Sequence, residues 1–178
     1  FMKRLFLCAT TLASTFTLAI ALVLAGSWPP AAAAQNTASM TVTLTITANC
    51  TIAANNLSFG SHGVLATALT NTTTVNVTCT NTTPYTVGLS VGTGTGSTFA
   101  NRVMNGTTAG NTASTVSYQL YQPTPNQTVV WGDTGASDRV SGVGNGSSQA
   151  LTVNGSVPAQ TTPATDLYTS TVTATVYF

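Results

Sequence analysis

Large apolar side chains and threonines alternate strictly over residues 40–47, in the order Met-Thr-Val-Thr-Leu-Thr-Ile-Thr. Successive side chains of a β-strand point to opposite faces, so Met40, Val42, Leu44 and Ile46 would form one apolar face. Full burial of four such side chains contributes roughly 6 to 12 kcal/mol before ordering costs. The alternation predicts a strand that needs a groove. By itself it fits either the first strand of the chain's own sandwich or a strand that one subunit donates to another.

The rest of the chain reads as short β-rich runs between segments rich in Gly, Pro, Asn and Ser, without a convincing helical period. The runs are 50–59, 73–79, 85–91, 115–121, 128–131, 149–153 and 167–178. This pattern predicts an all-β fold, specifically a β-sandwich.

The last run carries an apolar face that includes Val172, Ala174, Val176 and Phe178. We expect this face to point inward as far as the last residue. Because no strand follows residue 178 in this sequence, the strand beside it would come from elsewhere in the chain or from another molecule.

Residues 1–34 fit a secretory signal peptide. Lys3 and Arg4 precede an apolar run over residues 5–25, and the alanines at 31–34 fit an Ala-x-Ala cleavage site. We predict a mature chain that begins near Gln35 and has no integral membrane span. A retained N-terminal anchor is the alternative, because the apolar run is about as long as a membrane span.

Charged side chains are scarce beyond the predicted signal. They are Arg102, Asp133, Asp138, Arg139 and Asp166. Such a surface has no basic patch for nucleic acid, and its Thr, Ser, Asn, Gln and Gly content favours an extracellular β protein.

Two cysteines remain after signal removal, Cys50 and Cys79. An even count in an exported chain predicts one disulfide, which would contribute roughly 3 to 4 kcal/mol on the chain-entropy model.

The inventory of reactive side chains argues against an enzyme, a metal or a cofactor. His62 is the single histidine, and both cysteines of the mature chain are expected to be in the disulfide, so no thiol is left to act with it. We expect Asp133 to bond local backbone in a turn, and Asp138 to form a surface ion pair with its neighbour Arg139. A calcium site at the two aspartates would need more oxygen ligands than they supply.

An ordered series of segments resembles the spore coat protein U domain, and the resemblance covers nearly all of the mature chain. The segments are Cys50-Thr51-Ile52, Leu57-Ser58-Phe59-Gly60, Val75 to Thr80, Pro84-Tyr85, Arg102-Val103-Met104, Val116 to Tyr121, Trp131-Gly132-Asp133 and Tyr168 to Phe178. That family includes subunits of archaic, Csu-type chaperone-usher pili.

The resemblance implies an incomplete immunoglobulin-like sandwich that lacks one strand. Its groove would be filled first by a periplasmic chaperone and then by the N-terminal strand of the next subunit, after passage through an outer-membrane usher. Residues 35–49 would be the donor strand and a short connector, and residues 50–178 the pilin domain. Val172, Ala174, Val176 and Phe178 would then line the acceptor groove or contact the chaperone.

The implied function is a structural subunit of an extracellular pilus or fibre, a homo- or hetero-polymer that supports surface adhesion and biofilm formation. A spore or cell-surface coat protein is one alternative. A carbohydrate-binding adhesin module is the other, with Tyr85, Tyr118, Tyr121 and Trp131 as candidate stacking residues.

Overall fold

The computed structural model describes residues 32–124 and 128–178. The chain divides into two units, residues 1–43 and 44–178. Most of the predicted signal peptide, 1–34, therefore lies outside the described residues. The described part of the first unit, 32–43, is exposed and contains no helix or strand.

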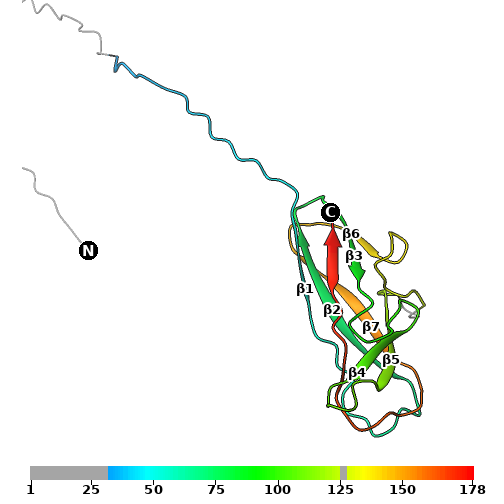
Figure 1. Ribbon diagram of the computed structural model, residues 1–178. Helices are drawn as coiled ribbons and strands as arrows, with labels where there is room; N and C mark the ends of the chain where they lie inside the picture. The colour runs from blue at the N-terminus through cyan, green and yellow to red at the C-terminus, as the bar shows by residue number, and fades with distance from the viewer. Residues whose placement is uncertain (1–31, 125–127) are drawn as a thin grey trace, which may run out of the picture. The chain divides into compact units, whose positions relative to one another are not determined.

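The second unit is a sandwich of two antiparallel sheets (Figure 1), which confirms the predicted all-β class. The larger sheet has the strand order β1-β2-β7-β5-β4-β8, and the smaller sheet has the order β6-β3-β9. The strands are β1 (Cys50–Ala54), β2 (Leu69–Cys79), β3 (Pro84–Leu89), β4 (Arg102–Gly106), β5 (Thr115–Tyr121), β6 (Val140–Val143), β7 (Ser148–Val157), β8 (Tyr168–Thr169) and β9 (Ala174–Tyr177).

Alternation of apolar and polar residues explains why these strands face one another. In β2, Val75, Val77 and Cys79 are buried, while the residues between them are more accessible. In the opposite sheet, Val87 and Leu89 of β3 are buried in the same core. Each sheet therefore contributes one apolar face to a single core.

Aromatic side chains fill this core. Trp131 is completely buried, and its indole Nε1 donates a hydrogen bond to the carbonyl oxygen of Val87 at 2.8 Å. Tyr85 and Tyr118 are also buried, and Tyr121 is half-buried. The prediction of a carbohydrate-stacking surface is therefore wrong, because three of the four aromatic side chains are packed inside the sandwich.

Arg102, the first residue of β4, is a completely buried cation. Its guanidinium donates to the carbonyl oxygens of Leu89, Ser90 and Trp131 at 2.7 to 3.2 Å, and to Oε1 of Gln119 at 2.6 Å. Burial lowers the pKa of Arg102 below its usual value. These bonds join β4 to the end of β3, to β5 and to the segment that precedes β6.

Two sequence-based strand predictions need correction, and two strands were missed. Residues 128–131 form no strand, because only Val130 makes an isolated bridge, to Tyr121. The predicted run 50–59 is a strand only to Ala54. Strands β4 and β6 were not predicted. Both are short, and each contains a glycine, at positions 106 and 142, that suggested a turn.

The predicted terminal strand, 167–178, is also wrong as a single element. It is divided into β8, which pairs with β4, and β9, which pairs with β3 in the other sheet. Side chains replace the ladder where the chain crosses between sheets: Thr171 N donates to Thr93 Oγ1, and Thr173 N to Ser90 Oγ, both at 2.9 Å. The crossing makes β9 an edge strand of the smaller sheet.

Candidate functional site

Two strand edges on the same side of the sandwich are left unpaired within the described residues. Strand β1 pairs with β2 alone, and β9 pairs with β3 alone. Figure 1 shows β9 (red) with β3 on one side and β1 on the other, and residues of β1 and β9 lie close together. An unpaired edge presents a row of backbone N–H and C=O groups that can accept another strand.

The two edges run in opposite directions. Cys50 opens β1 opposite Cys79, and Tyr177 closes β9 opposite Thr86, near the start of β3. Because only residues 80–83 separate β2 from β3, Cys50 and Tyr177 lie at the same end of the sandwich. We call this the disulfide end, and the opposite end, where Leu69 of β2 pairs with Val157 of β7, the far end.

The wall on the β1 side continues past the strand without a ladder. Asn55 N donates to Thr74 O at 3.0 Å, and Asn71 Nδ2 donates to Ser58 O at 2.6 Å. These bonds hold residues 55–59 beside β2, while the Leu57 side chain reaches into the core. Gly155 of β7 makes room for it, because a Cβ there would lie 2.4 Å from Leu57 Cδ2.

Two adjoining cavities lie between the segments that follow β1 and precede β9, and of these two strands only Ala54 and Ala174 line them. The middle cavity, about 470 Å³, is bounded by residues 54–59 on one side and by Val172 and Ala174 on the other. The far-end cavity, about 710 Å³, lies between residues 57–65 and 162–170. Both share Leu57, Phe59 and Met104, so they form one continuous space, which we call the edge groove.

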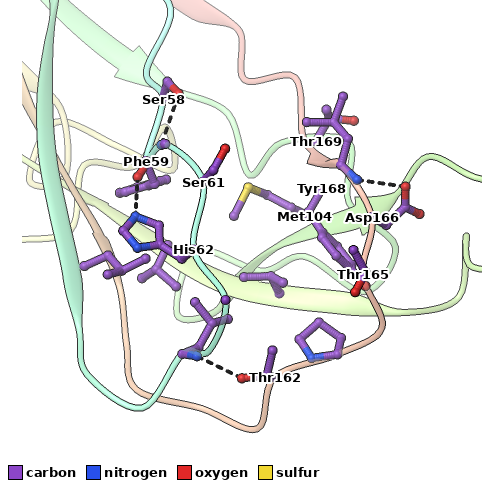
Figure 2. A pocket seen from close by; sticks show the side chains of 18 of the residues that line it. Ser58, Phe59, Ser61, His62, Met104, Thr162, Thr165, Asp166, Tyr168 and Thr169 are labelled. Carbon is purple, nitrogen blue, oxygen red and sulfur yellow. Dashed lines mark hydrogen bonds between the residues drawn. The ribbon is translucent and has the colours of Figure 1, made fainter.

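The edge groove has an apolar floor and a polar rim. Figure 2 shows Met104 between the two walls of the far-end cavity, with Ser58 and His62 on one side and Thr165 on the other. His62 Nε2 lies 2.7 Å from the carbonyl oxygen of Phe59. Such a groove can take an extended segment whose alternate side chains are apolar.

Asp166 organises the rim of the far end. Its carboxylate accepts hydrogen bonds from Thr108 N and Oγ1, Thr107 Oγ1, Asn111 Nδ2 and Leu167 N at 2.8 to 3.3 Å. These bonds, led by that of Thr108 N, hold the pKa of the Asp166 carboxyl well below its usual value. The charged form therefore fixes the loop before β8 against the loop after β4.

We expect the stability from Asp166 to be lost in acid. A carboxyl whose pKa is depressed on folding stabilises the fold above its unfolded pKa, near 3.8, and loses this contribution as the pH falls toward the folded pKa. Asp166→Asn should lower the thermal unfolding midpoint at pH 7 and have a smaller effect at pH 2. Equal effects at both pH values would contradict this role of the charge.

The segment predicted as a donor strand is fully accessible in the described residues. Met40, Val42, Leu44 and Ile46 are exposed by 85, 82, 85 and 76% respectively. Each residue of 44–49 is exposed and lies outside the strands.

The disulfide end is covalently fixed. Cys50 and Cys79 form the predicted disulfide, across a sequence separation of 29 residues. Beside it, Thr80 N donates to Asn49 O at 3.0 Å, and Asn49 N donates to Thr80 Oγ1 at 2.8 Å. The residue that precedes β1 is thereby tied to the end of β2.

The four terminal-strand residues singled out from the sequence occupy different environments. Val172 and Ala174 line the middle cavity. Val176 is half-buried against the core, whereas Phe178 is 60% exposed, so the inward-facing pattern stops before the last residue. The sequence did not lead us to place Leu57, Phe59 or Met104 in the groove. Leu57 and Phe59 are two residues apart, so their alternation could have indicated a shared apolar face on an extended segment.

The expected ion pair between Asp138 and Arg139 is wrong. Arg139 Nε instead contacts Asp133 Oδ1 at 2.7 Å. Asp138 accepts from the backbone N–H groups of Thr134 and Gly135, so it is the aspartate that caps a local turn. A side chain that bonds its own turn cannot reach the guanidinium next to it in sequence.

Within the described residues, there is neither a cluster of three or more potential metal-ligating His, Cys, Asp or Glu side chains nor an apolar helix long enough to cross a membrane.

One solved structure with a similar fold is the CsuC-CsuE chaperone-tip adhesion subunit pre-assembly complex from archaic chaperone-usher Csu pili of Acinetobacter baumannii. The TM-score is 0.53 at 24% sequence identity, and the match covers 75% of this chain but 40% of that chain. This chain thus matches less than half of that longer protein. No curated protein matches this sequence.

The family model of the Spore Coat Protein U domain matches residues 36–175, a range that includes the exposed alternating segment, the disulfide and both walls of the edge groove. The chain belongs to the Spore Coat Protein U domain family.

Proposed function

We propose that this chain is a structural subunit of an extracellular fibre or pilus that assembles by donor-strand exchange. The single observation that carries the proposal is the edge groove, which adjoins two unpaired strand edges in a chain that also has an exposed, strictly alternating segment. The groove needs a strand, and the segment needs a groove. The role is structural, not catalytic.

The alternating segment suits the groove in spacing and in chemistry. At about 3.3 Å per residue, an extended strand from Met40 to Ile46 spans roughly 20 Å, about one residue more than a six-residue stretch of wall such as 54–59. Its apolar face would cover Leu57, Val172 and Ala174, and its threonines would face solvent. Backbone bonds to the segments that follow β1 and precede β9 would hold the strand in the groove.

Because β1 and β9 run in opposite directions, an incoming strand is antiparallel to one edge and parallel to the other, and the positions of the connectors favour the strand that is antiparallel to β9. A donor antiparallel to β9 would enter with Met40 nearer the disulfide end and would leave the groove at the far end. The connector 47–49 then joins it to the donating subunit beyond the far end. The acceptor's own connector leaves at the disulfide end, so the two do not compete for space.

This arrangement is head-to-tail and does not require closure into a ring, so repetition gives a fibre. The donor and the acceptor are two copies of this chain, or this chain and a related subunit. Because the groove is apolar before exchange, a periplasmic chaperone that covers it, and an outer-membrane usher that releases it, are the expected assembly partners. The Csu complex with a similar fold supports that expectation. The finished fibre would lie on the cell surface, where it supports adhesion and biofilm formation.

Cysteine cross-linking tests the proposal. We expect a chain carrying Val172→Cys to form intermolecular disulfides with a second, differently tagged chain carrying Val42→Cys or Leu44→Cys. Thr43→Cys and Thr45→Cys are the matched controls, because their side chains point to the opposite face of the same strand. Non-reducing gels of the mixed chains report the result.

Two results would contradict this assignment. Equal cross-linking from threonine and apolar positions would mean that the strand does not bind by its apolar face. With both cysteines placed in one chain, cross-links confined to monomers at every protein concentration would show that the segment closes the groove of its own chain.

A further inference from the structure

Strand β9 borders the edge groove at Ala174 and continues from there as an unpaired edge toward the disulfide end. It is four residues long, and its one ladder partner is β3. A short edge strand with one neighbour frays readily. A wall that must present a straight row of backbone groups to an incoming strand therefore needs support from its other side.

A cluster of three side chains supplies this support at the end of β9. The hydroxyl of Tyr177 donates to Asp133 Oδ2 at 3.1 Å, and Arg139 Nε donates to Asp133 Oδ1 at 2.7 Å. The Arg139 guanidinium also lies 3.8 Å from the centroid of the Tyr177 ring. We call Asp133, Arg139 and Tyr177 the β9 clamp.

The β9 clamp lies on the outer face of the smaller sheet, away from the groove. In β3, Tyr85, Val87 and Leu89 point into the core, so Thr86 and Gly88 point outward. Tyr177 pairs with Thr86 and shares its outward face. The Asp133 carboxylate lies directly over Gly88, where an added Cβ would be 2.1 Å from Oδ1. Glycine at position 88 is what allows the carboxylate to approach the sheet.

The opposite end of β9 is held separately. Ser90 N donates to Thr173 O, and Thr173 N donates to Ser90 Oγ, both at 2.9 Å. The carbonyl of Ser90 is itself fixed by the buried Arg102. Both ends of β9 are therefore held by groups that leave its groove edge free.

Of the seven charged side chains in the sequence, two belong to the β9 clamp. We propose that the β9 clamp is a positioning device for strand uptake, which holds the open edge of β9 in place until a donor strand supplies the second ladder. This inference rests on the proposed function. It predicts that the clamp affects the rate of uptake more than the stability of the filled groove, because the donor takes over the support of β9.

The test measures capture of a fluorescent synthetic peptide of residues 36–47 by the exported chain. In every acceptor, Leu44→Asp disables the chain's own donor segment, and circular dichroism checks the fold. Tyr177→Phe removes one hydroxyl of the clamp. Gly88→Ala displaces the Asp133 carboxylate without removing any clamp atom. Tyr121→Phe, a hydroxyl deletion outside the groove lining and the clamp, is the matched control.

We expect Tyr177→Phe and Gly88→Ala to slow peptide capture about threefold to tenfold, the range that follows from losing one or two charge-assisted contacts near a surface. Tyr121→Phe should leave the capture rate unchanged, and the dissociation rate of captured peptide should change less than twofold in the clamp variants.

Unchanged capture rates in both clamp variants, with a lowered unfolding temperature, would overturn the proposal and leave the clamp a stabilising contact. Loss of peptide capture in the acceptor with an intact clamp would instead overturn strand uptake itself, so the two failures are distinguishable.

Discussion

Replacing Leu44 with aspartate is expected to abolish fibre formation. In the proposed fibre, Leu44 is a central residue of the donor strand, and its side chain is buried in the groove of the next subunit. Burial of an unpaired carboxylate costs several kcal/mol, and the substitution also removes the roughly 1.5 to 3 kcal/mol of a buried leucine. Together these are comparable to the total that the apolar face contributes. Electron microscopy of material sheared from cells that express each variant measures the result.

Thr45→Asp is the control for this experiment, because it introduces the same charge on the solvent face of the same strand. Its fibres should form nearly as well as those of the unaltered chain. A mixture offers a further check. The Leu44→Asp chain still has a groove, so it should accept a strand but fail to donate one, and fibres should become shorter as its fraction rises. Normal fibres from Leu44→Asp alone would exclude residues 40–46 as the inserted strand.

The parts of this molecule that could be predicted from its sequence are those with a strong local period. The valines of β2, at alternating positions, and the two cysteines in an exported chain predicted an all-β core and a disulfide. Strand β4 has no such period. It begins with Arg102, which reads as a surface residue, and ends with Asn105-Gly106, which reads as a turn. Its place in the sheet depends on bonds to distant carbonyls, which local patterns do not reveal.

The groove was predictable on one side only. Val172 and Ala174 belong to an alternating run and were expected to line it, whereas residues 55–65 and Met104 were not. The wall from 55 to 59 keeps its place through side-chain bonds such as that between Asn71 and Ser58. Such contacts between residues distant in sequence depend on the tertiary fold, so local sequence propensity does not predict them.

The exchange of roles between two aspartates has a similar cause. Adjacency in sequence favoured a pair between Asp138 and Arg139, but residues 134–138 fold into a tight turn that Asp138 caps. Arg139 then points toward Asp133 and toward Tyr177, which belongs to β9. The turn decides the pairing, and β9 supplies the aromatic partner.

Arg102→Met is expected to lower the free energy of unfolding by about 3 to 6 kcal/mol. Methionine has a similar length but no donors, so the carbonyl oxygens of Leu89, Ser90 and Trp131 and the amide oxygen of Gln119 would lose bonds in a buried site. A buried acceptor without a partner costs about 1 to 3 kcal/mol, and small shifts relieve part of the sum. Since domains are stable by about 5 to 15 kcal/mol, this loss is severe. Urea unfolding, with Leu44→Asp in both chains to prevent polymerisation, measures the difference.

Arg102→Lys separates charge from geometry at the same position. An ammonium keeps the charge but cannot fork to acceptors on three segments, so its stability should lie between those of the unaltered chain and Arg102→Met. A loss below about 1 kcal/mol for Arg102→Met would mean that the guanidinium bonds merely offset the cost of burying the charge. Because Ser90 links Arg102 to Thr173, the methionine variant should also capture donor peptide more slowly than its reduced stability alone explains. The buried cation would then support the groove from inside the core as the β9 clamp supports it from the surface.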